Sequence, residues 1–242
     1  MTDEFSCPGT GKIGEVLMVR SAKWTTPALS YRDEKVGVAE IRHEAYPPGI
    51  YLMEGVNGCG LWENRSPLPY TSLRINGREW MVDDPLHWIG MQMLARESRG
   101  RVFVGGLGLG LVVHALAANP KVTEIIVAER EPSIIELIGK YLPPKVLVLR
   151  GDVYEKARGI LVPFDTVILD IWVGHGTQVC HQEMEEARHF FRLHSPKAKF
   201  MVWGSTEPES NPAITASPDL LQRITDMKRE MAMQASFVRV EA

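Results

Sequence analysis

Val102-Phe-Val-Gly105-Gly106-Leu-Gly108-Leu-Gly110-Leu111 is the stretch that decides the fold of this chain. Its first residues predict a short buried strand, because a strand covered on both faces is apolar throughout instead of alternating. The glycines that follow favour a tight turn, since glycine has no Cβ and adopts positive φ angles without strain. We expect a helix over about 110–118 to come next, with its N-terminal N–H groups free to meet a ligand.

Strands and helices alternate along the rest of the chain. Short apolar runs predict strands over 101–104, 124–128, 145–149, 166–170 and 199–203. The segments between and after them predict helices over about 132–141, 153–160, 177–193 and 219–233, and a last strand over 237–240. Because such alternation places helices on both faces of a parallel sheet, we predict an α/β fold with a Rossmann-like doubly wound sheet.

The first part of the chain has a different pattern. Stretches 14–20 and 35–41 are short, apolar and rich in β-branched residues, and 72–82 alternates around Asn76-Gly77, a dipeptide typical of tight hairpin turns. Asp83-Asp84 before Pro85 then predicts the start of a helix. We therefore divide the chain into a small antiparallel β-rich N-terminal domain, 1–84, and a Rossmann-like domain, 85–242.

Composition narrows the class of protein. The 242 residues carry 27 basic and 30 acidic side chains, a balance that argues against binding to a nucleic-acid backbone. Three widely spaced cysteines favour a reducing compartment over a disulfide framework. No apolar run approaches the about 20 residues of a membrane span, and the N-terminus lacks the features of a secretory signal. We expect a soluble cytoplasmic protein with no membrane partner.

Acidic residues close three of the predicted strands. Glu129 is placed to accept hydrogen bonds from the hydroxyls of an adenosine ribose, and Asp152 to reach an adenine amino group. Asp170 closes the fourth strand. Each acid alone is as readily a helix cap or a solvated loop residue, but three of them beside a glycine turn favour an adenosine-containing cofactor.

The spacing of the glycines bears on which cofactor binds. It is GxGxG, whereas dinucleotide-binding proteins have GxGxxG, and no Lys or Ser/Thr is placed to cradle phosphates. The acids suit a cofactor with one nucleoside, no pyrophosphate and a positive charge, namely S-adenosylmethionine, although an NAD-dependent oxidoreductase remains an alternative. The candidate cofactor-binding residues are Gly105, Gly106, Gly108, Gly110, Glu129, Asp152 and Asp170.

Residues 72–203 resemble the spermidine synthase family, a branch of the class I S-adenosylmethionine-dependent methyltransferase fold. The resemblance rests on Leu73-Arg-Ile-Asn-Gly before a helix with His87-Trp88, on the glycine turn, on Ile126-Val-Ala-Glu-Arg-Glu-Pro132, and on Gly151-Asp152 with Phe164-Asp-Thr-Val-Ile-Leu-Asp170. It implies a β-rich N-terminal segment before the Rossmann-like domain. It also implies S-adenosylmethionine or its decarboxylated form as cofactor, and a homodimer.

The chain departs from that family where a polyamine would bind. Gly108 stands where the family has an Asp in the glycine turn. Trp88-Ile89-Gly90 stands where the family has a Tyr, then a His or Gln, then a Glu, and Val173 stands where it has a second Asp. Burying ammonium groups without carboxylates costs several kcal/mol each. We therefore favour methyl transfer to a small-molecule acceptor over aminopropyl transfer. Aminopropyl transfer with a rearranged acceptor site and a non-catalytic nucleoside-binding module both stay open.

Candidate catalytic residues follow from the chemistry of transfer. Displacement at a sulfonium often needs a group that accepts a proton from the nucleophile, and Asp170 is the first choice for it, with His175 second. His87, Trp88 and Trp172 are candidates for the acceptor pocket. The N/D-P-P-Y/F/W motif of enzymes that methylate bases in nucleic acids is absent after the fourth strand. We expect no metal site, because His181, Glu183, Glu185 and Glu186 fit a solvated helix surface.

Overall fold

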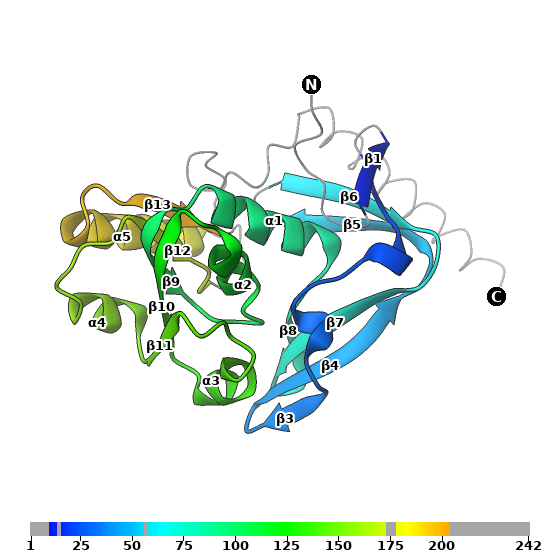
Figure 1. The fold of residues 1–242 in the computed structure, drawn as a ribbon, viewed down its shortest axis with the longest axis horizontal. Coiled ribbons are helices and arrows are strands. Elements are labelled where there is room, and N and C mark those ends of the chain that lie inside the picture. Colours follow the sequence, from blue (N-terminus) through cyan, green and yellow to red (C-terminus); the bar gives the residue numbers. More distant parts are fainter. Residues whose placement is uncertain (1–9, 14–15, 56–57, 173–177, 204–242) are drawn as a thin grey trace.

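Three β-sheets and the helices around them make up the part of the chain that the structure, a computed structural model, describes (Figure 1). The described residues are 10–13, 16–55, 58–172 and 178–203. Two four-stranded sheets lie before residue 83, and a five-stranded parallel sheet follows. The helix predicted over 219–233 and the strand predicted over 237–240 lie outside the described residues.

The five-stranded sheet has the order β11-β10-β9-β12-β13, and all neighbouring strands are parallel. Its strands are β9 (Gly100–Gly105), β10 (Val122–Glu129), β11 (Val146–Arg150), β12 (Thr166–Leu169) and β13 (Lys199–Val202). All five strands predicted for this part are confirmed. The strand order and the helices on both faces make this a Rossmann-like doubly wound sheet.

The chain adds strands first on one side of β9 and then on the other, so the direction of the strand order reverses at β9. From β9 the chain passes to β10 and β11 on one side, and it returns to place β12 and β13 on the other. Leu169 pairs with Gly105, and the Asp170 N–H donates to the Gly105 carbonyl over 2.9 Å. Ligands of doubly wound sheets bind at the carboxyl ends of the strands where such a reversal occurs. The glycine turn and Asp170 therefore flank the expected ligand position.

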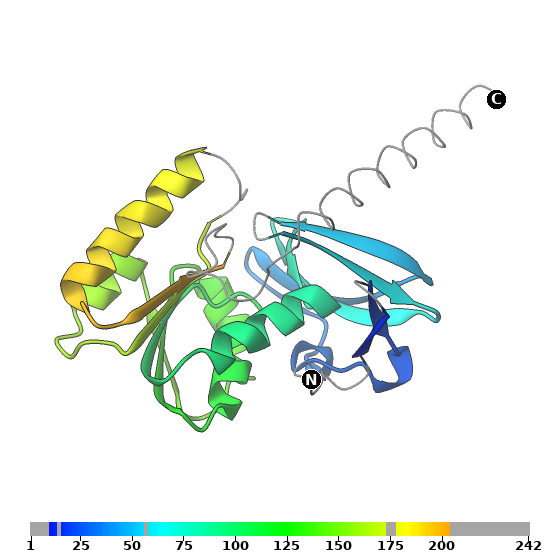
Figure 2. The same cartoon turned by 90° about the horizontal axis from the view of Figure 1, so that it is seen from above.

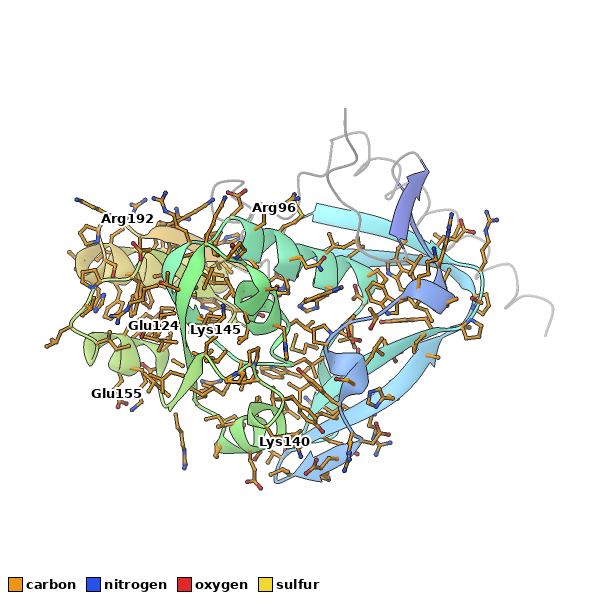
Figure 3. All side chains as sticks on the ribbon, in the orientation of Figure 1. Arg96, Glu124, Lys140, Lys145, Glu155 and Arg192 are labelled. Carbon is orange, nitrogen blue, oxygen red and sulfur yellow. The ribbon has the colours of Figure 1, made fainter. Side chains whose placement is uncertain are left out.

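Helices cover the two faces of this sheet, and α1 (Pro85–Arg96) and α5 (Gln178–His194) lie on opposite sides of it (Figure 2). Phe103 packs with α4 and α5 in one apolar cluster, whereas its neighbours Val102 and Val104 pack with α1, α2 and α3 in another. Side chains of a strand alternate between faces, so an apolar run is needed when both faces are covered. The helices are α1 (Pro85–Arg96), α2 (Leu111–Ala118), α3 (Pro132–Gly139), α4 (Val153–Arg158) and α5 (Gln178–His194). Exposed charged side chains, among them Arg96, Lys140 and Arg192, lie on the outside of this arrangement (Figure 3).

The strands before residue 83 form two sheets, ordered β1-β2-β6-β5 and β3-β4-β7-β8. They are β1 (Thr10–Ile13), β2 (Val16–Val19), β3 (Glu34–Val36), β4 (Ala39–Tyr46), β5 (Gly49–Gly55), β6 (Gly58–Asn64), β7 (Leu68–Ile75) and β8 (Arg78–Val82), with short 3₁₀ turns η1 (Ser21–Lys23) and η2 (Ala28–Ser30). The hairpin at Asn76-Gly77 is confirmed, with φ angles of 51° and 77°. Two details differ from the prediction. Stretch 35–41 is a hairpin that turns at Gly37, and β2 and β6 pair in parallel.

Helix α1 begins as the sequence predicts. The Asp84 carboxylate accepts hydrogen bonds from the Leu86 and His87 N–H groups, both at 2.9 Å, and Pro85 occupies the first turn. Asp83 turns back to the N-terminal strands and accepts from the Thr71 N–H over 2.6 Å. The two neighbouring carboxylates thus join α1 to the β-rich region. The domain boundary between residues 84 and 85 stays a prediction. No helix in the described ranges is both long and apolar enough to span a bilayer.

Candidate cofactor site

The turn after β9 brings backbone atoms close to β12. Gly106 has a φ angle of +89°, and a Cβ there would lie 2.3 Å from the Asp170 carbonyl oxygen. Gly108 has a φ angle of +50°, and its Cβ would lie 2.4 Å from the Met81 sulfur. Both positive φ angles therefore favour glycine. At Gly106 the backbone oxygen also leaves no room for a Cβ, whereas at Gly108 the Met81 side chain would have to move. Gly110 ends the turn as the N-cap of α2.

Strand β8 covers this glycine turn from the N-terminal region. The Leu109 N–H donates to the Met81 sulfur over 3.1 Å. A register shift in the β7–β8 pairing leaves Trp80 between the pairs Leu73–Met81 and Arg74–Glu79. Neighbouring strand residues normally face opposite sides, and a bulge of this kind redirects one of them. Trp80 and Met81 consequently both line the same cavity.

Tyr31 holds the turn from a second direction. Its hydroxyl donates to the Leu109 carbonyl over 3.0 Å and lies 2.9 Å from His114 Nε2. Burial lowers the pKa of His114, so a neutral imidazole that donates from Nε2 completes this chain of hydrogen bonds. Tyr31 also stacks on Tyr141, with ring centroids 4.2 Å apart. Sequence reasoning missed Tyr31, because nothing in the sequence around it signals a contact with a turn 78 residues away.

Glu129, at the end of β10, is buried, and backbone groups hold it in place. One carboxylate oxygen accepts from the Leu107 N–H over 2.9 Å, and the other accepts from the Glu131 N–H over 2.8 Å. The first of these bonds ties Glu129 to the glycine turn. Each carboxylate oxygen has a second lone pair, so both keep the capacity to accept a bond from a ligand hydroxyl.

Asp152 is the N-cap of α4. Its Oδ1 accepts from the Tyr154 and Glu155 N–H groups over 2.9 and 3.1 Å. The capping role that the sequence left open is therefore present. Both capping bonds end on Oδ1, so the cap itself leaves Oδ2 for another donor. Asp152 also lines the same cavity as Glu129.

Asp170 follows β12, which lies on the other side of β9 from the strands of Glu129 and Asp152, and it lines the same cavity. Burial, and then the negative charge of Glu129, raise the pKa of Asp170 to about 7. Both causes act against the ionised form of the carboxyl group. Near neutral pH, the ionised and the protonated forms of Asp170 are therefore both populated, which suits a general base.

One cavity of about 380 Å³ connects these groups, a size within the range of small-molecule sites. It lies at the carboxyl ends of the parallel strands, and residues of β7, β8 and α1 complete its lining. Seven predicted site residues line it: Gly106, Gly108, Glu129, Asp152, Asp170, His87 and Trp172. His175 lies outside the described residues, so its predicted role stays a prediction.

Three predicted site residues do not line this cavity. Gly105 lies between β12 and α4, where a Cβ would meet the Leu169 and Val153 side chains at 2.7 and 2.9 Å. Gly110 serves as the cap of α2. Trp88 is buried in the apolar core between α1 and the sheet and does not line this cavity, so its expected place in the acceptor pocket stays a prediction. Successive helix positions differ by about 100° in direction, so His87 and Trp88 face different surroundings.

Sequence reasoning also missed part of the lining. Ile75, Trp80 and Met81 come from the β7–β8 hairpin, and Trp203 follows β13. The Trp203 ring stacks on His87, with ring centroids 4.9 Å apart and planes 9° from parallel. The only available signal was their position at strand ends or beside a hairpin turn.

The acidic helix surface on α5 lies away from this site. His181, Glu183, Glu185 and Glu186 are all exposed, and Glu185 pairs with Arg188 at 3.2 Å. Within the described ranges, no three His, Cys, Asp or Glu side chains form a group able to hold a metal ion.

No protein-family model and no curated protein matches this sequence. Solved structures match with low scores. A precorrin-8W decarboxylase from Methanobacterium thermoautotrophicum has a TM-score of 0.34 and 22% identity, over 45% of this chain and 56% of that one. A spermidine synthase from Thermotoga maritima has a TM-score of 0.37 and 16% identity, over 58% and 47%. A spermidine synthase in complex with the transition-state analogue AdoDATO has a TM-score of 0.37 and 17% identity, over 58% and 46%.

The chain thus spans about half the length of the structures that it matches. At these scores the matches carry no argument about this protein. The Rossmann-like assignment rests on the order and direction of the strands in the chain itself.

Proposed function

We propose that this protein binds S-adenosylmethionine, or its decarboxylated form, and transfers a group from its sulfonium to a small-molecule acceptor. The observation that carries this proposal is the meeting of Glu129, Asp152 and Asp170, from the ends of three strands, in one cavity beside Gly106 and Gly108. A single acidic residue after a strand commonly serves only as the N-cap of the next helix. Three that converge on a glycine turn at the reversal of a doubly wound sheet form a nucleoside site.

The order of the strands suggests how a nucleoside is held. Glu129 and Asp152 follow neighbouring strands β10 and β11, on one side of the glycine turn, whereas Asp170 follows β12 on the other. We assign the ribose hydroxyls to Glu129 and the adenine amino group to Asp152. The sulfonium then faces Asp170, where a carboxylate favours a positive charge.

The cofactor supplies an activated carbon on sulfur when it is bound. The chain's own residues orient the reactants, exclude water and move a proton. Asp170, with its pKa near 7, accepts the proton that the nucleophile loses. Met81 and Trp80 close the cavity over the glycine turn and limit access of water to the reacting atoms.

The distribution of acids favours methyl transfer over aminopropyl transfer. Among the described residues that line the cavity, the acids are Glu129, Glu131, Asp152 and Asp170. The first three follow β10 and β11, where the nucleoside is assigned. Among the described lining residues, Asp170 alone remains for the acceptor, and one carboxylate does not balance the several ammonium groups of a polyamine.

Calorimetric titration with four ligands in parallel tests the proposal: S-adenosylmethionine, decarboxylated S-adenosylmethionine, methylthioadenosine and NAD. We expect S-adenosylmethionine to bind, and Glu129→Ala to weaken it by about 1–3 kcal/mol through loss of charge-assisted hydrogen bonds. Glu136→Ala, an exposed change on α3, is the matched control and should leave affinity unchanged.

Preference for the decarboxylated cofactor would move the proposal to aminopropyl transfer. Binding of methylthioadenosine without either sulfonium would favour a nucleoside-binding module. Binding of NAD alone, or of no ligand, would refute the proposal.

A further inference from the structure

The cavity has a wall that the assigned nucleoside leaves open. It consists of Asp170, Ile171 and Trp172 after β12, Trp203 after β13, and His87 on α1. In the sheet order, β12 and β13 lie on the opposite side of β9 from β10 and β11. We call these five residues the acceptor wall, because the proposed function requires a second reactant and this part of the cavity lies beside Asp170.

Aromatic rings make up most of the acceptor wall. The His87 and Trp203 rings are stacked, nearly parallel at 9°, and both side chains are buried. The Trp203 backbone N–H donates to the Leu169 carbonyl over 2.9 Å, which holds the Trp203 backbone against β12. Trp172 is partly buried against the apolar cluster under α5. The cavity therefore presents flat aromatic surfaces here, which suit a flat ligand better than a flexible chain.

The charges on the acceptor wall also limit the kind of ligand that it can bind. Asp170 is the single carboxylate among its five residues, and the wall contains no Lys or Arg. A polycation would leave ammonium groups buried without partners, and a polyanion would meet the charge of Asp170. An uncharged ring that carries one acidic proton matches both the flat apolar surfaces and the single proton acceptor.

We propose that the acceptor is a planar aromatic or heteroaromatic molecule, bound against Trp172 and the His87–Trp203 pair, whose hydroxyl group is the nucleophile. The proposal rests on the proposed function for the identity of the donor. In the transfer, the hydroxyl oxygen forms a bond to the methyl carbon, and the carbon–sulfur bond breaks with its electron pair going to sulfur. The hydroxyl proton goes to Asp170. The products are an aryl methyl ether and an uncharged thioether nucleoside.

The experiment uses the full chain with 2-naphthol as a planar phenol, and with cyclohexanol and putrescine as aliphatic comparisons. Binding of each is measured by saturation-transfer NMR and calorimetry, with and without saturating S-adenosylhomocysteine. We expect 2-naphthol to bind at one site while cyclohexanol and putrescine do not displace it. Trp172→Ala should weaken 2-naphthol about three- to tenfold, the usual range for loss of an aromatic contact. Trp172→Phe should restore most of the affinity.

Phe190→Ala is the matched control for folding. Phe190 is a partly buried aromatic residue packed against the same apolar cluster as Trp172, but it does not line the cavity. It should lower stability by a comparable amount and leave 2-naphthol affinity unchanged. A circular dichroism melt of each variant shows whether it is folded at the temperature of the titration.

The outcomes separate the two proposals. If S-adenosylhomocysteine binds but putrescine displaces 2-naphthol, or if Trp172→Ala and Phe190→Ala have equal effects, the aromatic acceptor is wrong and the donor assignment stands. If 2-naphthol binding depends on Trp172 but no adenosine ligand binds, the aromatic site stands and the proposed function fails.

Discussion

Asp170 should make the binding of a sulfonium depend on pH. Its pKa is raised to about 7 because the carboxyl group is buried near the negative charge of Glu129. A cation that enters the cavity stabilises the ionised carboxylate, so binding requires the loss of this proton. A ligand that needs ionised Asp170 should bind about tenfold more tightly at pH 8 than at pH 6, which is about 1.4 kcal/mol.

The assay compares two ligands that differ in one methyl group and one charge. Methylthioadenosine is an uncharged thioether, and its S-methylated derivative is a sulfonium. Calorimetric titration of each at pH 6, 7 and 8, at constant ionic strength, measures both affinities. We expect the sulfonium to gain affinity with rising pH and methylthioadenosine to change little. Asp170→Asn should abolish the difference, because an amide does not titrate in this range.

Two results would refute this reasoning. Equal pH dependence for both ligands would mean that Asp170 does not face the sulfur. A sulfonium dependence that survives in Asp170→Asn would mean that another group takes up the proton.

Three further predictions concern the structure of the site. The pKa of Asp170 is raised in the native state, so its contribution to stability is present below about pH 4 and is lost as pH rises through 7. In urea unfolding, the free energy of unfolding of Asp170→Asn should therefore rise by up to roughly 4 kcal/mol relative to the wild type between pH 4 and pH 8. Gly108→Ala should cost about 1–2 kcal/mol in thermal unfolding, through its positive φ and the clash with Met81, and adding Met81→Ala should recover only the part due to the clash. Tyr31→Phe should cost about 1 kcal/mol and weaken nucleoside binding, since the turn loses a hydrogen bond; a melt shift without an affinity change would limit Tyr31 to a structural role.

Much of the fold was predictable because its signals are local. The glycine turn, the apolar runs of β9 to β13, and the Asp84–Pro85 start of α1 each occupy a few neighbouring residues. The turn at Asn76-Gly77 depends on two positive φ angles, which the Asn-Gly dipeptide itself predicts. The carboxylates were predictable for a related reason: once the strands are known, the residue after each one must lie at the carboxyl edge of the sheet.

The rest of the site depends on contacts between distant segments. Trp80 reaches the cavity because β8 has a bulge, and no pattern of apolar residues predicts that bulge. The hairpin within stretch 35–41 could not be read from the sequence, because the β-branched pattern continues on both sides of the turn at Gly37, which has a φ angle of +53°. His87 and Trp88 were indistinguishable as pocket residues until the direction of α1 against the sheet was known.

The contacts that cross the predicted boundary at residue 84 argue for one functional unit. Leu109, in the glycine turn, is fully buried, and both of its backbone polar groups bond to residues before that boundary: its N–H to Met81 and its carbonyl to Tyr31. Without those partners, the turn would expose an apolar side chain and two backbone groups at the point where a ligand is expected. A Rossmann-like sheet places acids and glycines at its carboxyl edge by topology alone. Here the N-terminal strands fix the turn and supply the opposite wall, so the cavity is a property of the two regions together.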